Sequence, residues 1–312
     1  MMCYIINLIL TVFLLSGCSP VKKEAKKVSQ KGADILELAK YKVLPKKRGP
    51  KKKVLIAPFL CAWNPLSNYG IKVSSKFAQR LKHEPGNILV YLPKNPSSWM
   101  PDGFVPRFGI IDDPDMVKDA ASLNMNYLIT GIIDVMKVER RTNGVWPFRH
   151  FDQVFEAILV INVIDTVTGA LVESHMASER FAIPLKKLTK EENKLFRKVL
   201  NNTVPALIRK QVKLAAKVIE NDTWKAKIVE IEENPGRIKI NAGSRVGIKE
   251  GMLLEVHKWG KKLRSSNGNF FYCLGERLGI IKIVSVKKDY AFGVPLNKAD
   301  YKAGLPVICV EE

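Results

Sequence analysis

The pattern of apolar and polar positions divides the chain into four parts. Residues 5–15 are almost entirely apolar, and residues 19–53 are strongly polar. Beyond them lie two stretches in which short apolar segments alternate with turn residues. The first run has the length of a signal-peptide core and is too short to cross a bilayer as a helix.

Residues 54–220 alternate between the two periodicities of regular structure. Residues 54–60 are a continuous apolar run, as in a strand buried on both faces. Phe77, Ala78 and Leu81 share one side of an amphipathic helix over 73–83. Asp112 or Asp113 caps a helix over 114–123, which starts with Pro114. Further strands are expected over 88–92, 126–136, 153–165 and 170–181, and further helices over 190–200 and 204–219. This order predicts an α/β sandwich with a mixed sheet.

Residues 224–312 contain only strand patterns. Short segments over 226–232, 237–241, 252–257, 280–286, 290–294 and 306–310 are separated by tight turns. Gly243, Gly247 and Gly251 lack the spacing of a phosphate-binding loop, so we interpret them as turn glycines. The pattern predicts a small SH3-like β-barrel domain.

The apolar run ends in Leu15-Ser16-Gly17-Cys18, which resembles the lipobox of bacterial lipoproteins. The resemblance implies that residues 1–17 are a signal peptide and that Cys18 carries the lipid at the start of a tether over 18–53. By analogy, Ser19 is compatible with the outer membrane, on its periplasmic face. The alternative is a buried apolar segment with a chance cysteine, and the polar residues that follow disfavour it.

Charge adds a preference for anionic partners. The chain has 51 Lys and Arg against 30 Asp and Glu, a net charge of +21. Residues 19–53 hold 13 of the basic residues, and Pro45–Lys53 is expected to be extended and solvated. A signal peptide disfavours nucleic acid, which stays the last alternative. The anions of the envelope are phospholipid head groups, lipopolysaccharide phosphates, cell-wall polymers and acidic protein surfaces. The sequence leaves open whether the tether binds such a surface or is a linker.

Two segment pairs carry a family resemblance. Residues 123–131 and 159–169 are similar to strand and turn patterns of the amino-terminal domain of TolB and of CsgG. Residues 237–251 and 275–279 resemble the carboxy-terminal domain of FlgT-like proteins. The resemblance implies a non-enzymatic scaffold of an envelope complex, most concretely the flagellar basal body, that forms a homo-oligomeric ring. The alternative is an adaptor for peptidoglycan or for cell-wall or secretion machinery.

Candidate catalytic chemistry is sparse. The four histidines and Cys61, Cys273 and Cys309 show neither triad nor metal-ligand spacing, so we expect no catalytic residue, metal or cofactor. Whether Cys273 and Cys309 pair stays open. Asp134, Glu156 and Asp165 lie in or at the ends of strands, and Asp165 is expected to bind the turn over 166–169. A hydrolase that uses paired carboxylates remains an alternative.

Two segments resemble contact surfaces, because aromatic and arginine side chains are enriched at binding hot spots. The first, residues 140–149, is expected to be a loop, and its candidates are Arg140, Arg141, Trp146 and Phe148. The alternative for it is a hairpin whose Trp146 folds back on the core. The second, residues 259–272, offers Lys261, Lys262 and Arg264.

Overall fold

The computed structural model describes residues 49–62, 67–99, 109–110, 113–232, 236–264 and 270–309. The predicted signal peptide, Cys18 and the tether up to residue 48 lie outside the described residues. No helix in the described ranges combines the length and the apolar content that crossing a membrane requires.

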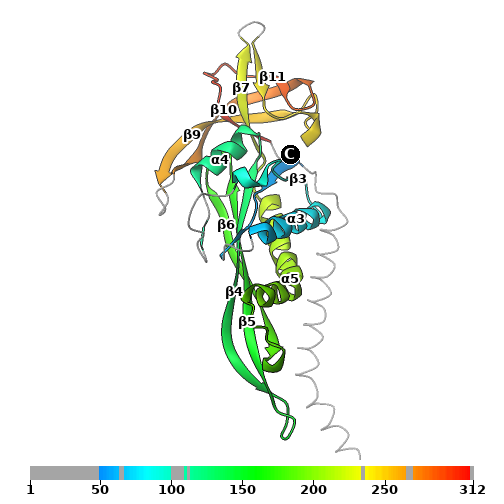
Figure 1. The fold of residues 1–312 in the computed structure, drawn as a ribbon. Helices are drawn as coiled ribbons and strands as arrows, with labels where there is room; N and C mark the ends of the chain where they lie inside the picture. The colour runs from blue at the N-terminus through cyan, green and yellow to red at the C-terminus, as the bar shows by residue number, and fades with distance from the viewer. Residues whose placement is uncertain are drawn as a thin grey trace, which may run out of the picture. The chain divides into compact units, whose positions relative to one another are not determined.

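A mixed sheet forms the first part of the fold (Figure 1). Its strands are β1 (Lys52–Ile56), β2 (Leu60–Cys61), β3 (Ile88–Tyr91), β4 (Tyr127–Asn143), β5 (His150–Asp165) and β6 (Leu171–Pro184). The order is β3-β1-β4-β5-β6, and β2 also pairs with β4. Strand β1 is parallel to β3 and β4, whereas β4, β5 and β6 are antiparallel. The predicted mixed sheet is therefore present.

Helices cover both faces of this sheet. Helices α3 (Ser67–His83) and α5 (Glu192–Asn221) pack on one face, where Phe77 and Leu81 are fully buried as predicted. Helix α4 (Pro114–Ser122) packs on the other face through Met116 and Ala120. Asp113 caps α4 by accepting a hydrogen bond from the Asp115 amide. Short 3-10 turns lie at Pro96–Trp99 and Leu185–Lys187.

The second part is a closed six-stranded barrel with its own apolar core. Its strands are β7 (Lys225–Glu232), β8 (Arg237–Ile240), β9 (Leu253–Arg264), β10 (Phe270–Val286), β11 (Ala291–Pro295) and β12 (Pro306–Cys309). The order around the barrel is β10-β11-β8-β7-β12-β9, and every pairing is antiparallel. A 3-10 turn, Ser244–Val246, precedes Gly247, whose φ of 93° suits glycine. The predicted barrel is present, and its SH3-like type stays a prediction.

Two predicted boundaries are wrong because of proline. The run 54–60 is not one strand, since β1 ends at Ile56 and β2 starts after Pro58, which has no amide to donate. The helices expected over 190–200 and 204–219 are one helix with Pro205 inside it. Pro205 and Asn201 both lie on the exposed side of α5, so water can satisfy the carbonyl that the missing amide leaves.

The end of the basic tether is also different from the prediction. Lys52 and Lys53 are buried and belong to β1, whereas Lys51 is exposed. The Lys52 ammonium donates to the carbonyls of Ile219, at 2.5 Å, and of Asp222 at the end of α5. A helix end leaves such carbonyls without partners, so the lysine stabilises it.

Candidate functional site

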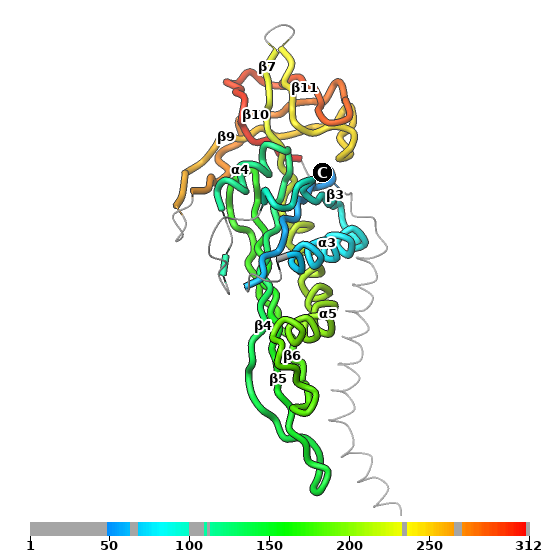
Figure 2. Tube along the Cα trace, in the orientation of Figure 1, coloured from blue at the N-terminus to red at the C-terminus, as the bar shows by residue number. Residues whose placement is uncertain are grey.

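The first candidate surface is the end of the β4–β5 hairpin, residues 140–151. Strands β4 and β5 are longer than predicted and pair as far as Asn143 opposite His150, so Arg140 and Arg141 lie in β4 and not in a loop. The last β6 residue paired with β5 is Pro184, opposite Asp152. Beyond that pair the ribbon has two strands, and Figure 1 and Figure 2 show it extending past the rest of the sheet.

The turn of this hairpin exposes large apolar side chains. Val145, Trp146 and Phe148 are 80, 76 and 82% exposed, so Trp146 does not fold back on the core. The Phe148 amide donates to the Val145 carbonyl at 2.7 Å, and the Asn143 amide group donates to the Asp152 carboxylate. These bonds order the turn without burying its apolar groups.

The charges at this end are all of one sign. Residues 140–150 contain three arginines, at positions 140, 141 and 149, and no acidic residue. All three are exposed, and among the described residues none of them forms an ion pair. Two carboxylates flank this segment: Glu139, which is exposed in β4, and Asp152, which is buried and lies 3.7 Å from the His150 imidazole. The end of the hairpin therefore combines an apolar tip with unpaired positive charge.

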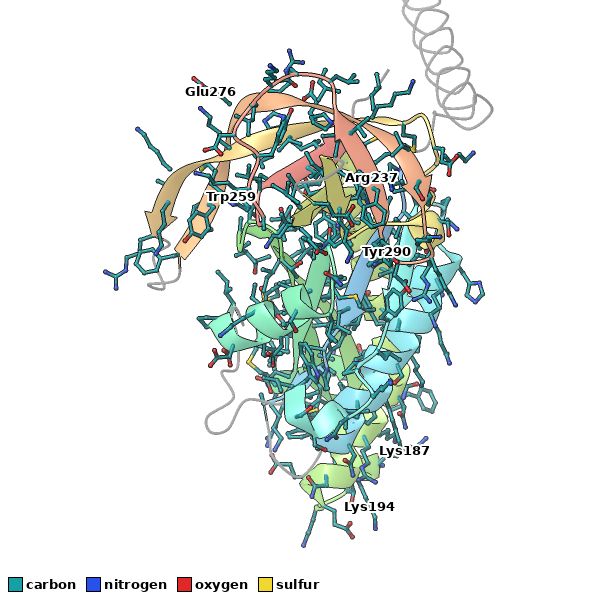
Figure 3. All side chains as sticks on the ribbon, turned by 90° about the horizontal axis from the view of Figure 1, so that it is seen from above. Lys187, Lys194, Arg237, Trp259, Glu276 and Tyr290 are labelled. Carbon is teal, nitrogen blue, oxygen red and sulfur yellow. The ribbon has the colours of Figure 1, made fainter. Side chains whose placement is uncertain are left out.

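The second candidate surface is the β9–β10 hairpin. Trp259, Lys261, Lys262 and Arg264 belong to β9 and not to a loop, since Arg264 still pairs with Phe270. Figure 3 shows Trp259 on this strand. The Lys262 ammonium lies 4.1 Å from the centre of the Phe270 ring, and the Arg264 guanidinium lies 5.8 Å from the same ring.

The aromatic side chains of the second hairpin are largely occupied within the chain. The Trp259 and Tyr272 rings lie 5.4 Å apart, and the Trp259 indole donates to the Gly304 carbonyl at 3.1 Å. The Tyr272 amide donates to the Thr168 carbonyl of the mixed sheet at 2.9 Å. What this hairpin still offers is mainly cationic: Lys261, Lys262 and Arg264 are exposed.

A buried ionic cluster joins the mixed sheet to the barrel, and sequence reasoning missed it. The Lys225 ammonium lies 3.0 Å from the Asp165 carboxylate and 2.8 Å from that of Asp222. The Tyr127 hydroxyl donates to Asp222 at 2.5 Å. As predicted, Asp165 also accepts from the turn, at 2.8 Å from the Val167 amide. No local signal links these residues, which lie up to 98 positions apart.

The cluster is built for structure and has no room for a substrate. Burial alone would raise the pKa of Asp222, but hydrogen bonds from Lys225 and Tyr127 hold it below its usual range. Burial alone would lower the pKa of Lys225, yet the nearby Asp165 and Asp222 raise it. The adjoining cavity has a volume of about 10 Å³, which holds one water at most.

Other predicted chemistry is dispersed. Cys61, Cys273 and Cys309 form no disulfide with one another, so the Cys273–Cys309 disulfide is not formed. Glu156 lies 3.7 Å from Arg180, and Asp134 accepts from the Val135 amide, so these carboxylates have separate partners. Within the described residues, no three His, Cys, Asp or Glu side chains gather as a metal site would need.

The layer of α3 and α5 carries positive charge that the sequence analysis did not single out. Together the two helices have eleven Lys and Arg against two Glu, a net charge of +9. Lys194 of α5 points away from the ribbon in Figure 3. A groove of about 550 Å³ between the helices has Lys76 and Arg80 on one side and the apolar Val204 and Ile208 on the other.

Comparison with known proteins gives only distant likeness. No family model matches the sequence, and no curated protein matches it. Similar solved structures include a neuraminyllactose-binding hemagglutinin homolog from Helicobacter pylori, with 13% identity, a TM-score of 0.36 and coverage of 57% of this chain and 91% of that one. A PelC dodecamer from Paraburkholderia phytofirmans has 15% identity, a TM-score of 0.31 and coverage of 57% and 95%.

Lipoprotein GNA1162 from Neisseria meningitidis is also similar, with 13% identity, a TM-score of 0.28 and coverage of 53% of this chain and 99% of that one. Likeness at these identities and TM-scores identifies neither a family nor a function for the chain. Its FlgT-like membership accordingly stays a prediction.

Proposed function

We propose that this chain is a non-enzymatic outer-membrane lipoprotein, anchored through Cys18 on the periplasmic face, that acts as a scaffold in an envelope complex. The observation that carries the proposal is the pair of hairpin ends. One comes from the mixed sheet and one from the barrel, and both present cations to solvent beside aromatic side chains. Such surfaces are typical of binding, because aromatic and arginine side chains dominate interface energetics.

The most concrete complex, through the resemblance to FlgT-like proteins, is the flagellar basal body, in which the chain would form a homo-oligomeric ring. The second candidate is an adaptor that binds peptidoglycan or a secretion machine. The net charge of +21 favours it, because cell-wall polymers are anionic and a cationic protein meets them faster.

Crosslinking in the native cell tests the scaffold. A photoreactive residue is placed at Lys261 on the second hairpin, and the control is the same residue at Leu296, which is 57% exposed on the barrel. We expect a discrete protein adduct from position 261 and none from position 296. Flagellar proteins in the adduct would support the basal body. If position 261 gives no protein adduct and purified peptidoglycan pulls the chain down, the adaptor is supported.

Cys18→Ser tests the anchor. We expect the parent to be processed, acylated and recovered with the outer membrane, and the variant to lose all three properties. Equal fractionation of the two proteins, with neither acylated, contradicts the lipoprotein. Equal adducts from positions 261 and 296 contradict the scaffold.

A further inference from the structure

We infer that the end of the β4–β5 hairpin inserts into the interfacial region of a bilayer that contains anionic lipid. The inference rests on the proposed function, because it names the partner of one of its two surfaces. It starts from the exposed apolar side chains of Val145, Trp146 and Phe148. They form a convex turn, and no strand beyond β4 and β5 reaches it in the described part of the chain.

The shape and the side chains of this turn favour a bilayer over a protein pocket. Trp carries an apolar ring with one polar edge and concentrates where lipid chains meet headgroups. Trp146, with Val145 and Phe148 beside it, stands at the extreme end of a narrow ribbon, which can enter a soft interface without a matching cavity. The second hairpin has no such free tryptophan, because the Trp259 indole donates to the Gly304 carbonyl and its ring packs at a tilt against that of Tyr272.

The arginines lie where a bilayer has its phosphates. Arg149 is next to the tip, and Arg141 lies two residues before the end of β4 at Asn143, or about 7 Å along the strand at about 3.3 Å per residue. An interfacial segment buries its apolar groups about 5–10 Å into the boundary between headgroups and chains. Flexible arginine side chains span the remainder and bind phosphate with two hydrogen bonds.

The absence of acid strengthens the match. Residues 140–150 hold no Asp or Glu, and Asp152 is buried and accepts a hydrogen bond from Asn143. The exposed Glu139 lies farther from the turn than Arg140 and Arg141. Along residues 140–150 an anionic headgroup layer therefore meets arginines and no carboxylate. On a zwitterionic layer the apolar side chains would still contribute to the free energy of binding, but most of the contribution of the arginines would be lost.

Vesicle partitioning tests the inference with the full chain in a Cys18→Ser background, so that no acyl chain contributes. The vesicles contain phosphatidylglycerol and phosphatidylethanolamine, and phosphatidylcholine vesicles serve as the uncharged comparison. We expect Trp146→Ala/Phe148→Ala to lower the partition coefficient at least about tenfold. We expect Arg140→Gln/Arg141→Gln to lower it about tenfold on anionic vesicles and far less on phosphatidylcholine.

Two matched controls distinguish the effect of the hairpin from the effect of removing an exposed apolar side chain or positive charge elsewhere on the chain. Leu296→Ala removes another exposed apolar side chain, and Lys213→Gln/Lys217→Gln removes two exposed charges from α5. Each is expected to change partitioning less than about threefold, because the removed groups lie outside the surface that enters the lipid. Other segments that bind lipid are identical in all variants, so the ratios report the hairpin.

Depth-dependent quenching gives a second readout that does not depend on total binding. Trp146 emission, taken as the difference between the parent and Trp146→Phe, should be quenched by lipids brominated near the headgroup. An unquenched Trp146, or equal partitioning of parent and Trp146→Ala/Phe148→Ala, overturns the inference. The inference is also overturned if position 146 crosslinks to a protein or to a second copy of the chain while Trp146→Ala/Phe148→Ala leaves vesicle partitioning unchanged. That result would leave the proposed scaffold role standing. Hairpin insertion, together with a parent protein whose Cys18 is found without acyl chains in the native cell, would overturn the lipoprotein and leave the bilayer contact.

Discussion

At the scale of single residues, the clearest prediction concerns Lys225, a buried cation that pairs with two carboxylates. Its ammonium is almost fully buried between Asp165 and Asp222. Lys225→Met would leave the buried Asp165 and the half-buried Asp222 without their cation, and breaking a buried pair in this way costs about 3–5 kcal/mol. We expect a loss of that size in the free energy of unfolding, measured by urea denaturation.

The matched control is Lys239→Met in the same barrel. Lys239 pairs with Glu230 at 3.0 Å, but both side chains reach solvent. Water screens this pair, so the free energy of unfolding should change little. Equal losses in the two variants would show that burial does not distinguish the two lysines.

The same cluster predicts how stability depends on pH. Asp222 has a lowered pKa in the folded chain, so its stabilisation is complete above about pH 4 and is lost as the pH falls through the folded value. Lys225 has a raised pKa, so its stabilisation is complete below about pH 10 and is lost as the pH rises through the folded value.

Urea denaturation of the parent and of Lys225→Met across this range isolates the cluster from other titrating groups. The difference between their free energies of unfolding should be constant from about pH 5 to pH 10 and should shrink toward both extremes. A difference that does not vary with pH would assign the loss to packing alone.

At the scale of elements, the contact between β1 and the end of α5 is testable through two neighbouring lysines. Lys52→Met should destabilise the chain by about 1–3 kcal/mol, because the carbonyls at the end of α5 lose a charged donor. Lys51→Met, one residue earlier and exposed, should change stability little. Thermal unfolding followed by circular dichroism compares them, and equal midpoints would refute the capping role of Lys52.

These lysines also show what local sequence can reveal. The run that contains Lys51, Lys52 and Lys53 was expected to be solvated, as a cluster of like charges usually is. The partner of Lys52 is a helix end 167 positions away, and no local pattern encodes such a contact. The core face of α3 and the cap at Asp113 were predicted correctly because both depend on residues a few positions apart.

The same distinction applies to the candidate surfaces. Trp146 and the arginines beside it are neighbours in sequence, so the hairpin end was identifiable, although its strands were predicted too short. Backbone pairing continues through the polar residues Lys137 to Asn143, which carry no apolar alternation to mark a strand. No local sequence pattern marks the positive charge of α3 and α5, because its lysines and arginines are spread over two helices that only the fold brings together.

At the scale of the whole molecule, the described residues form three apolar clusters, one on each face of the mixed sheet and one inside the barrel, and polar contacts join the sheet to the barrel. Besides Lys225 with Asp165, the Asn241 side chain donates to Asn124 at 3.0 Å, and the Lys51 amide donates to the Val246 carbonyl at 2.7 Å. Opening the mixed sheet or the barrel would break these bonds, of which the Lys225–Asp165 pair is buried. The mixed sheet and the barrel should therefore unfold together, although a chain of this length often unfolds in steps.

Native-state hydrogen exchange measures this coupling directly. The slowest amides of α5 and of β9 should report the same free energy of opening in the parent, because both need global unfolding to exchange. Lys225→Met removes the strongest shared contact, so the two values should separate, while Lys239→Met should leave them equal. A lower value for β9 than for α5, already in the parent, would mean that the barrel opens by itself. The contacts of the barrel with Asn124 and Asp165 would then orient the second hairpin but would not prevent its motion. A partner that binds both hairpins would also have to order the barrel.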